Sequence, residues 1–379
     1  MTNHYFLGGT SAAGFQTRFQ EVIREPGYFT YILKGGPGTG KSTLMKRLAS
    51  YFSEGTIDAY RCSSDLHSLD AVVLHEKKVI IVDGTAPHIF QPEVPGVAQT
   101  LVDLGAHWDQ TKLVQEEMGI RRCLQENARY HRRARSFVTA LTAVKGSIYE
   151  QAFDRLQHQA LARAFPDLLD TLLKEVPGEA SGKASGKIGT VSYRQLSAIT
   201  TEGYYSQKPP KGTRQFWIYD PWYGAGIQIL TQLREAVSAL GYDVQISDCV
   251  LFPTHQLEHL SIPSLNCRFS LISSMDQLTA AASENPPVQD ERPVSEASVS
   301  KNKNSGPPLD CRKFYDLGEE ESALWRAAAL AISLEKEAAD SIRKALEIHD
   351  QLEAFYIGAL DFEALDGVAE KLIHEIRRR

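Results

Sequence analysis

Cysteine is scarce in this sequence, and the few cysteines are not paired. Five cysteines lie far apart in 379 residues, and no two of them form a C-x-x-C motif. An odd number of dispersed cysteines excludes a disulfide-stapled scaffold and argues against a cysteine-rich zinc site. We therefore expect a reducing compartment, the cytoplasm, and a fold that is stabilised by its own hydrophobic core.

Long apolar runs and an excess of basic charge are also absent. No run approaches the roughly 18 apolar residues that predict a membrane span, and the N-terminus lacks a basic segment followed by an apolar one. We expect neither a membrane segment nor a secretory signal. The formal net charge is −6. This balance argues against a protein that coats nucleic acid, because such proteins are strongly basic.

What the sequence does contain is an alternation of strand and helix patterns. Residues 28–34 are aromatic and β-branched and predict a strand, which a glycine cluster and an apolar helical spacing follow. Residues 57–62 and 78–82 predict a second and a third strand. Strands that alternate with helices indicate an α/β fold with a parallel sheet. From 97 to 175 helical spacing dominates, so we expect a helical hairpin appended to the sheet.

Composition divides the chain into two halves. Residues 177–192 predict a flexible linker, because Gly, Ser and Lys dominate their first part. Residues 283–308 are rich in Pro, Ser, Glu and Lys and nearly free of large apolar side chains, which predicts a disordered insertion. Helical spacing returns from 318 to 379. The expected domains are therefore 1–176 and 193–379.

The two halves share a weak internal repeat. Residues 30–44 align with 216–230, so that Gly38 faces Gly224 and Gly40 faces Gly226. Shorter matches occur in the same order: 4–15 with 194–205, Cys62 with Cys249, 102–105 with 315–318, and 148–154 with 355–361. Because this order is common to both halves, we predict a duplicated α/β domain, each copy with its own appended helical hairpin.

A phosphate-binding motif stands between the first predicted strand and the helix that follows it. Residues 35–42 read G-x-x-x-x-G-K-S, the Walker A pattern of P-loop proteins. The glycines allow several backbone N–H groups to point at one anion, and the positive end of the helix adds to the attraction. We expect Lys41 to bind the β- and γ-phosphates of ATP, Ser42 to bind Mg²⁺, and Thr43 to contact the α-phosphate. The predicted binding residues are Gly35, Gly36, Pro37, Gly38, Thr39, Gly40, Lys41, Ser42 and Thr43.

A buried strand that ends in Asp83 supplies the second part of such a site. A carboxylate at the carboxyl edge of a parallel sheet lies beside the phosphates, where it holds Mg²⁺ or its water. The alternative is that Asp83 only caps the turn that follows. No Glu follows Asp83, so the usual general base of strong ATPases is missing from its place. Asp65 and His88 are candidates to orient water or substrate, or are ordinary turn and loop residues.

The loop of the second half lacks the chemistry of the first. The alignment puts Ile227 and Gln228 in place of the lysine and the serine. Without the cation and the hydroxyl this loop is not expected to hold Mg·ATP, and Asp220 adds a negative charge. We interpret it as a degenerate P-loop. Its alternative use is to bind a different ligand, on which Trp222 and Tyr223 would stack.

One predicted helix is rich in arginine. Its basic residues are Arg121, Arg122, Arg129, Arg132, Arg133 and Arg135, with His131 among them. They form a lid that closes over phosphates, a contact to a nucleic-acid backbone, or a solvated helix face. The neighbouring Glu116, Glu117 and Glu126 favour the solvated face.

Several of these strings together resemble a known family. They are GGPGTGKSTL at 35–44, SSDLHSLD at 63–70, VIIVDGTAPH at 79–88 and GVAQTLVDLGAHWD at 96–109. The chain resembles an uncharacterised bacterial family of tandem P-loop NTPases, described as ATP-binding proteins or as nucleotide kinases. The resemblance extends over nearly the whole chain. It implies two P-loop NTPase domains and nucleotide binding, and it implies no particular reaction.

The sequence thus predicts a Mg²⁺-dependent ATPase with one intact and one degenerate nucleotide site. Lys41 and Asp83 are the predicted catalytic residues, and Ser42 and Asp83 are the predicted metal ligands. No N-K-x-D string selects guanine, so adenine is the expected base. Two alternatives remain open: a nucleoside or nucleotide kinase, supported by the arginine-rich helix, and a non-catalytic module that binds ATP and recruits a protein partner.

Overall fold

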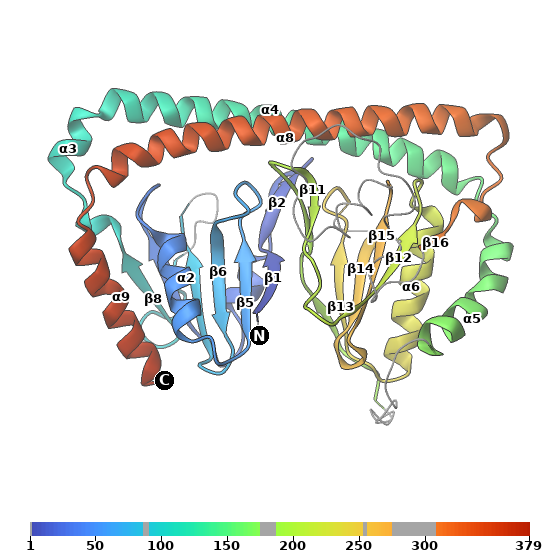
Figure 1. Ribbon diagram of the computed structural model, residues 1–379, viewed down its shortest axis with the longest axis horizontal. Coiled ribbons are helices and arrows are strands. Elements are labelled where there is room, and N and C mark those ends of the chain that lie inside the picture. Colours follow the sequence, from blue (N-terminus) through green and yellow to red (C-terminus); the bar gives the residue numbers. More distant parts are fainter. Residues whose placement is uncertain (1, 86–90, 175–186, 253–255, 275–307) are drawn as a thin grey trace. The chain divides into compact units, whose positions relative to one another are not determined.

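A computed structural model describes residues 2–85, 91–174, 187–252, 256–274 and 308–379 (Figure 1). The described residues form an α/β fold with two six-stranded mixed sheets and helices packed on them. Most of the linker expected at 177–192 and of the insertion expected at 283–308 lies outside the described residues.

The first sheet has the strand order β1-β5-β6-β7-β4-β8. Its strands are β1 (Thr2–Phe6), β4 (Phe29–Lys34), β5 (Ile57–Arg61), β6 (Leu69–Leu74), β7 (Val79–Asp83) and β8 (Gln99–Asp103). The pairs β1–β5, β4–β7 and β4–β8 are parallel. The pairs β5–β6 and β6–β7 are antiparallel. A small hairpin of β2 (Gly8–Ser11) and β3 (Gly14–Thr17) follows β1.

The second sheet repeats this arrangement, with the order β9-β13-β14-β15-β12-β16. Its strands are β9 (Val191–Tyr193), β12 (Arg214–Tyr219), β13 (Val244–Asp248), β14 (Leu257–Ile262), β15 (Cys267–Ile272) and β16 (Leu309–Asp310). Each pair has the same direction as its counterpart in the first sheet. The hairpin recurs as β10 (Ser197–Thr200) and β11 (Gly203–Ser206).

Fine details of the two halves also match, which supports the predicted duplication. A β-bulge interrupts β5–β6 after Tyr60 and β13–β14 after Ser247. In the first hairpin turn the Ser11 hydroxyl donates to the carbonyl oxygen of Gly14, and in the second the Thr200 hydroxyl donates to that of Gly203. A shared strand order, shared directions and shared irregularities indicate one fold used twice.

Our expectation of parallel sheets is confirmed only in part: most strands are parallel, but one strand in each sheet runs against its two neighbours. Only four residues, 75–78, join β6 to β7, and four residues, 263–266, join β14 to β15. A parallel crossover needs a dozen or more residues, so connections this short produce antiparallel hairpins. Lys78 and Asn266 adopt positive φ angles in these two turns.

The helices also occur in matched sets. The N-terminal ones are α1 (Phe19–Ile23), α2 (Lys41–Tyr51) and α3 (Gln110–Gln115), and α6 (Gly224–Ala239) is the counterpart of α2. Each half has one helix of 37 residues after its last strand: α4 (Glu117–Phe153) in the first half and α8 (Glu321–Ile357) in the second. They lead into α5 (His158–Lys174) and α9 (Phe362–Arg377). Short 3₁₀ helices are η1 (Gly105–His107), η2 (Pro263–Leu265), η4 (Arg312–Phe314) and η5 (Gly318–Glu320).

The chain forms two compact units, and the helices of the two halves are exchanged between them. The first unit contains 1–139, 198–205 and 335–379, and the second contains 140–197 and 206–334. The end of α8 and all of α9 therefore belong with the first sheet, while the end of α4 and all of α5 belong with the second. We expected each half to keep its own helical hairpin.

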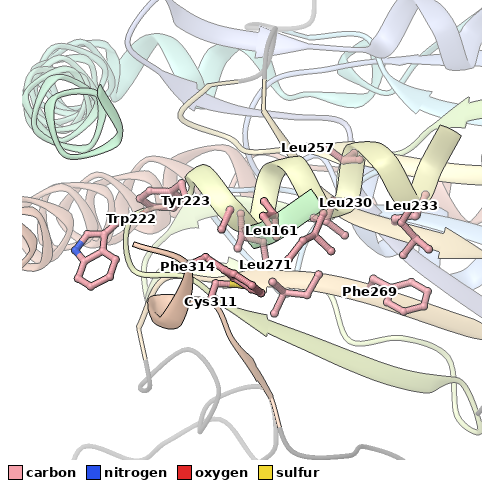
Figure 2. Packing of buried hydrophobic residues seen from close by; sticks show 14 of the residues in the cluster. Leu161, Trp222, Tyr223, Leu230, Leu233, Leu257, Phe269, Leu271, Cys311 and Phe314 are labelled. Atoms are coloured by element: carbon pink, nitrogen blue, oxygen red, sulfur yellow. The ribbon is translucent and has the colours of Figure 1, made fainter. Parts of the chain in front are cut away.

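Each unit has its own hydrophobic core. In the first, α2 and α9 lie together on one face of the sheet (Figure 1), where Leu48 and Ile376 are fully buried. In the second, α6 and α5 pack on the sheet, and Leu230, Leu233 and Leu161 are among the buried side chains (Figure 2). Apolar residues of α9 come from the second half of the sequence, and those of α5 come from the first.

Three strands of the first sheet were not predicted, and β1 at the N-terminus is one of them. Strand β6 lies between the second and third predicted strands, and β8 lies inside the segment 97–175 that we expected to be helical. The apolar residues of β8 allow a helical interpretation in isolation. The strand forms because β4 offers a parallel edge with which Gln99–Asp103 can pair.

Candidate functional site

The glycine-rich loop connects β4 to α2 at the carboxyl edge of the first sheet. Gly38 and Gly40 have φ angles of +69° and +76°, in the left-handed region that side chains with a Cβ rarely adopt. Gly40 is also the N-cap of α2, and no side chain caps the backbone N–H groups of the first turn. The loop therefore presents main-chain donors beside the positive end of a helix.

Lys41 and Thr39 hold the loop in its curled shape. The ammonium group of Lys41 donates to the carbonyl oxygens of Gly35 and Gly36, at 3.0 and 2.9 Å. The buried Thr39 hydroxyl donates to the same Gly36 oxygen at 2.9 Å. The first residue of α2 thus folds its cation back over the loop.

Asp83 caps the turn that follows β7, and its other carboxylate oxygen lies near Lys41. Its Oδ1 accepts hydrogen bonds from the backbone N–H and the hydroxyl of Thr85, at 2.8 and 2.6 Å, and so caps the turn. Its Oδ2 lies 3.7 Å from Nζ of Lys41. Both side chains are mostly buried. The end of β7 therefore points a carboxylate at the loop lysine.

The other predicted loop residues follow Lys41 in the first turn of α2. The hydroxyl of Ser42 accepts a hydrogen bond from the backbone N–H of Leu69 at 3.0 Å, which ties the helix to the start of β6. Thr43 is exposed. Gly35, Gly36, Pro37, Gly38 and Gly40 are all partly exposed.

A second carboxylate, which our sequence analysis missed, stands beside Asp83. Asp70 is the extra residue of the β5–β6 bulge and directly precedes Ala71, which pairs with Val82, the residue before Asp83. Burial raises the pKa of Asp70 to about 7, and the Asp83 carboxylate adds to this rise. The charge of Lys41 has the opposite effect on this pKa. An acidic residue inside an otherwise apolar strand was the available signal, but β6 itself was not predicted.

Helix α8 closes one side of the loop. The backbone N–H of Gly38 donates to Oε1 of Glu353 at 3.0 Å. A Cβ atom on Gly38 would lie 2.9 Å from the backbone oxygen of Glu353 and 3.0 Å from Cγ1 of Ile357. Trp108 and Tyr356 lie beside Gly36, with their ring centres 5.2 Å apart. No local sequence signal links Glu353 to the loop, because 315 residues separate it from Gly38.

Hydrogen bonds and neighbouring positive charge favour the ionised form of Glu353. The side-chain hydrogen bond with His349 holds the pKa of Glu353 below its usual value, and Nε2 of His349 lies 3.4 Å from Oε1. The hydrogen bond from the Gly38 N–H and the charge of Lys41 act in the same direction, while burial opposes them. The loop therefore faces a carboxylate rather than a carboxylic acid.

The remaining candidates have ordinary structural roles where they are described. Asp65 accepts from the backbone N–H of His67 and the hydroxyl of Ser68, as a turn residue does. His88 lies outside the described residues. In the arginine-rich helix α4, Arg121 pairs with Glu117 and Arg133 pairs with Glu337. All six arginines are exposed, as on a solvated helix face.

The loop of the second unit is occupied by a carboxylate of its own. Counting from the matched strand ends, Lys34 and Tyr219, Gly226 and Ile227 stand in place of Lys41 and Ser42. Counting instead from the helix starts, Lys41 corresponds to Gly224, because the second loop is two residues shorter. By either count the lysine and the hydroxyl are absent. Asp220 is fully buried.

Three donors hold the Asp220 carboxylate. They are the N–H of Gly226 at 2.9 Å, the N–H of Trp222 at 3.0 Å and the hydroxyl of Tyr315 at 2.8 Å. Burial raises the pKa of Asp220, and these hydrogen bonds counteract the rise. A carboxylate therefore takes up main-chain N–H groups that a phosphate would need.

Trp222 and Tyr223 do not offer a stacking surface. Their side chains are 1% and 5% exposed and belong to the hydrophobic core of the second unit (Figure 2). The Trp222 ring packs against Tyr315 and Trp325, and Lys145 lies over the Tyr223 ring. Gln228, at the position next to Ile227, contacts His158 of α5. These aromatic residues stabilise the core.

The described part of the chain has neither a membrane-spanning helix nor a ready-made group of metal ligands. None of its helices is both long enough and apolar enough to span a membrane. Within the same ranges, no three acidic, histidine or cysteine side chains gather into a group that could hold a metal ion by themselves.

Comparisons of this chain with known proteins found no match. Neither the family models, nor the curated proteins, nor the solved structures include a match to this chain.

Proposed function

We propose that the glycine loop of the first unit binds the triphosphate of ATP, and that both units are P-loop NTPase domains in tandem. The observation that carries this proposal is the position of Lys41. Its cation bridges the carbonyl oxygens of the loop and lies 3.7 Å from Asp83, at the point where α2 begins. Cation, carboxylate and helix N-terminus at the carboxyl edge of one sheet are the groups that a Mg·triphosphate requires.

The donor set fits magnesium as the accompanying ion. Mg²⁺ is usually held by one or two carboxylates and by substrate phosphates and water, rather than by a cage of protein ligands. Asp83 and the Ser42 hydroxyl would hold the ion here, which agrees with the absence of a larger ligand cluster among the described residues. When bound, Mg²⁺ supplies charge neutralisation at the phosphates.

We further propose that the first unit hydrolyses ATP, and that it does so slowly. Lys41 would neutralise charge on the transferred phosphoryl group, and the loop N–H groups would orient it. Asp70 lies close enough to Asp83 for the Asp83 charge to raise its pKa, and it would orient the attacking water. It takes the place of the glutamate that is missing after Asp83.

The second unit would then be a degenerate copy that binds no triphosphate. Asp220 repels phosphate and already accepts the hydrogen bonds of Gly226 and Trp222. We propose ATP as the nucleotide and the cytoplasm as the compartment. All five cysteines are free, which supports a reducing environment.

A second candidate function is an ATP-sensing module that binds nucleotide without turnover and recruits a protein partner. One observation favours it: Glu353 of α8 is bound to the loop, so nucleotide binding would change the contacts of a long helix. The kinase alternative receives no such support, because the arginines of α4 are exposed or paired with glutamates of helices.

The fate of the γ-phosphate tests these alternatives. Purified protein is mixed with γ-labelled ATP and Mg²⁺, beside the variants Lys41→Ala and Lys46→Ala, and the products are separated. Lys46 is an exposed lysine on the same helix and serves as the matched control. We expect free phosphate from the wild type and from Lys46→Ala and none from Lys41→Ala. Tight binding without phosphate release would favour the sensor, and no binding by the wild type would contradict the proposed site.

A further inference from the structure

In each unit a carboxylate accepts a backbone N–H hydrogen bond from the loop, but the two carboxylates differ in kind. In the second unit the anion is Asp220, which belongs to the loop itself and is fully buried. In the first unit it is Glu353, which belongs to a different helix and keeps 37% of its side chain exposed. A buried loop residue is a permanent occupant, whereas a half-exposed side chain of another helix can leave without unfolding the loop.

Glu353 and a phosphate group compete for the same donor. A backbone N–H makes one strong hydrogen bond, and the N–H of Gly38 already donates to Oε1 of Glu353 at 3.0 Å. A phosphate in the curl of the loop needs this donor and would lie against the carboxylate, which is held in its charged form. Two anions cannot share one donor without strong repulsion, so one of them must move.

The departure of Glu353 also affects the helix that carries it. The backbone of Glu353 and the side chain of Ile357 fill the space next to Gly38, and Tyr356 lies next to Gly36. This turn of α8 therefore lies on the loop with little free space. The same helix begins at Glu321, and its residues up to 334 belong to the second unit.

We propose that Glu353 is an internal anion that keeps the glycine loop closed, and that ATP opens the loop by displacing it together with the last turns of α8. This inference rests on the proposed nucleotide site. The apparent affinity for ATP is then lowered by the fraction of molecules in which the carboxylate occupies the loop. The displacement of Glu353 would couple nucleotide binding in the first unit to α8, a helix that has residues in both units.

Charge removal at Glu353 tests the competition. Glu353→Gln keeps the size of the side chain and removes its charge, and Glu347→Gln makes the same change on the same helix. Glu347 is exposed, pairs with Lys344 and has no role at the loop. We expect Glu353→Gln to bind Mg·ATP about tenfold more tightly than the wild type, because a charge-assisted hydrogen bond no longer competes. Glu347→Gln should bind like the wild type.

Hydrogen exchange of the wild type supplies a second measurement that needs no altered residue at position 353. We expect Mg·ATP to accelerate amide exchange in residues 349–357, because this turn loses its contacts with the loop. Lys41→Ala should show no such change at the same ATP concentration.

The outcomes separate this inference from the proposed function. If the wild type binds ATP, but Glu353→Gln binds no more tightly and exchange at 349–357 is unchanged, the displacement is wrong and the nucleotide site stands. Weaker binding by Glu353→Gln also overturns it, because Glu353 would then support the ligand. If neither the wild type nor Glu353→Gln binds ATP, the proposed function fails, and the displacement fails with it.

Discussion

Trp108 forms an antiparallel bridge with Leu360, although one lies before the first long helix and the other after the second. The second unit contains the mirror relationship, a bridge between Leu156 and Tyr315. Main-chain hydrogen bonds flank both bridges, at 2.7 and 3.0 Å in the first unit and at 2.8 and 3.1 Å in the second. In each half, the end of the long helix and the helix that follows it therefore belong to the same unit as the sheet of the other half.

The exchange of helices predicts which unit a mutation in α9 destabilises. Ile376 is fully buried in the core of the first unit. Ile376→Ala should destabilise that unit by about 2–5 kcal/mol, because it removes apolar contacts and leaves a cavity. Amide hydrogen exchange should rise in strands 29–34 and 79–83. Lys371→Ala, an exposed change on the same helix, is the control. A rise confined to strands 214–219 and 267–272 would contradict the exchange.

The occupied loop of the second unit predicts a large structural cost for losing Asp220. Asp220→Ala leaves three buried donors without their acceptor, so we expect a loss of roughly 3–5 kcal/mol in unfolding free energy. Tyr315→Phe removes one hydroxyl of the same network and should cost about 1–3 kcal/mol. Denaturant unfolding measures both.

The exposed Glu235, which pairs with Arg234 on α6, provides the control for that experiment. Glu235→Gln should change the unfolding free energy by less than about 0.5 kcal/mol. An Asp220→Ala protein as stable as Glu235→Gln would mean that the carboxylate does not hold the loop.

The two roles of Asp83 can be separated by mutation. Asp83→Asn keeps an oxygen for the Thr85 hydrogen bonds but removes the charge, so ATP hydrolysis should fall by on the order of 100-fold. Thr85→Val removes the hydroxyl that the turn uses and leaves the carboxylate in place. Its hydrolysis should stay within about threefold of the wild type. Steady-state phosphate release at saturating Mg·ATP measures the difference, and equal losses in the two variants would assign Asp83 to the turn alone.

Asp70 has a counterpart that makes a matched comparison. Glu258 is the extra residue of the second bulge, as Asp70 is of the first, and both are buried. Asp70→Asn should retain ATP binding and lose most of the hydrolysis, because the water near Asp83 is no longer oriented. Glu258→Gln should leave the hydrolysis rate unchanged. Equal rates in Asp70→Asn and the wild type would remove Asp70 from the reaction.

Much of the α/β organisation was predictable from local pattern. The aromatic and β-branched run before Gly35, the glycine loop and the apolar spacing of α2 together predict a strand, a turn and a helix, and the structure has them in that order. The repeat was detectable for the same reason, since the motifs recur in the same order. Exact positions in the loop are not set by the repeat, because β4 and α2 are joined by residues 35–40, whereas β12 and α6 are joined by the shorter segment 220–223.

The direction of β6 and the existence of β8 were not predicted from the local pattern. A short turn at 75–78 makes β6 antiparallel, and an open edge of β4 makes Gln99–Asp103 a strand. The turn that sets the direction of β6 lies in the local sequence, whereas β4, the partner that makes Gln99–Asp103 a strand, lies far from it in the chain.

The amino-acid sequence by itself determined the loop of the first unit, because the positive φ angles of Gly38 and Gly40 and the cation of Lys41 are properties of local residue types. Only the tertiary structure decided what faces that loop. Glu353 reaches Gly38 through the exchange of helices, and Asp70 reaches Asp83 through an antiparallel pairing. The first contact depends on the burial of apolar helix faces across a long separation in sequence, a free energy that belongs to the folded chain as a whole. The second depends on the short turn between β6 and β7.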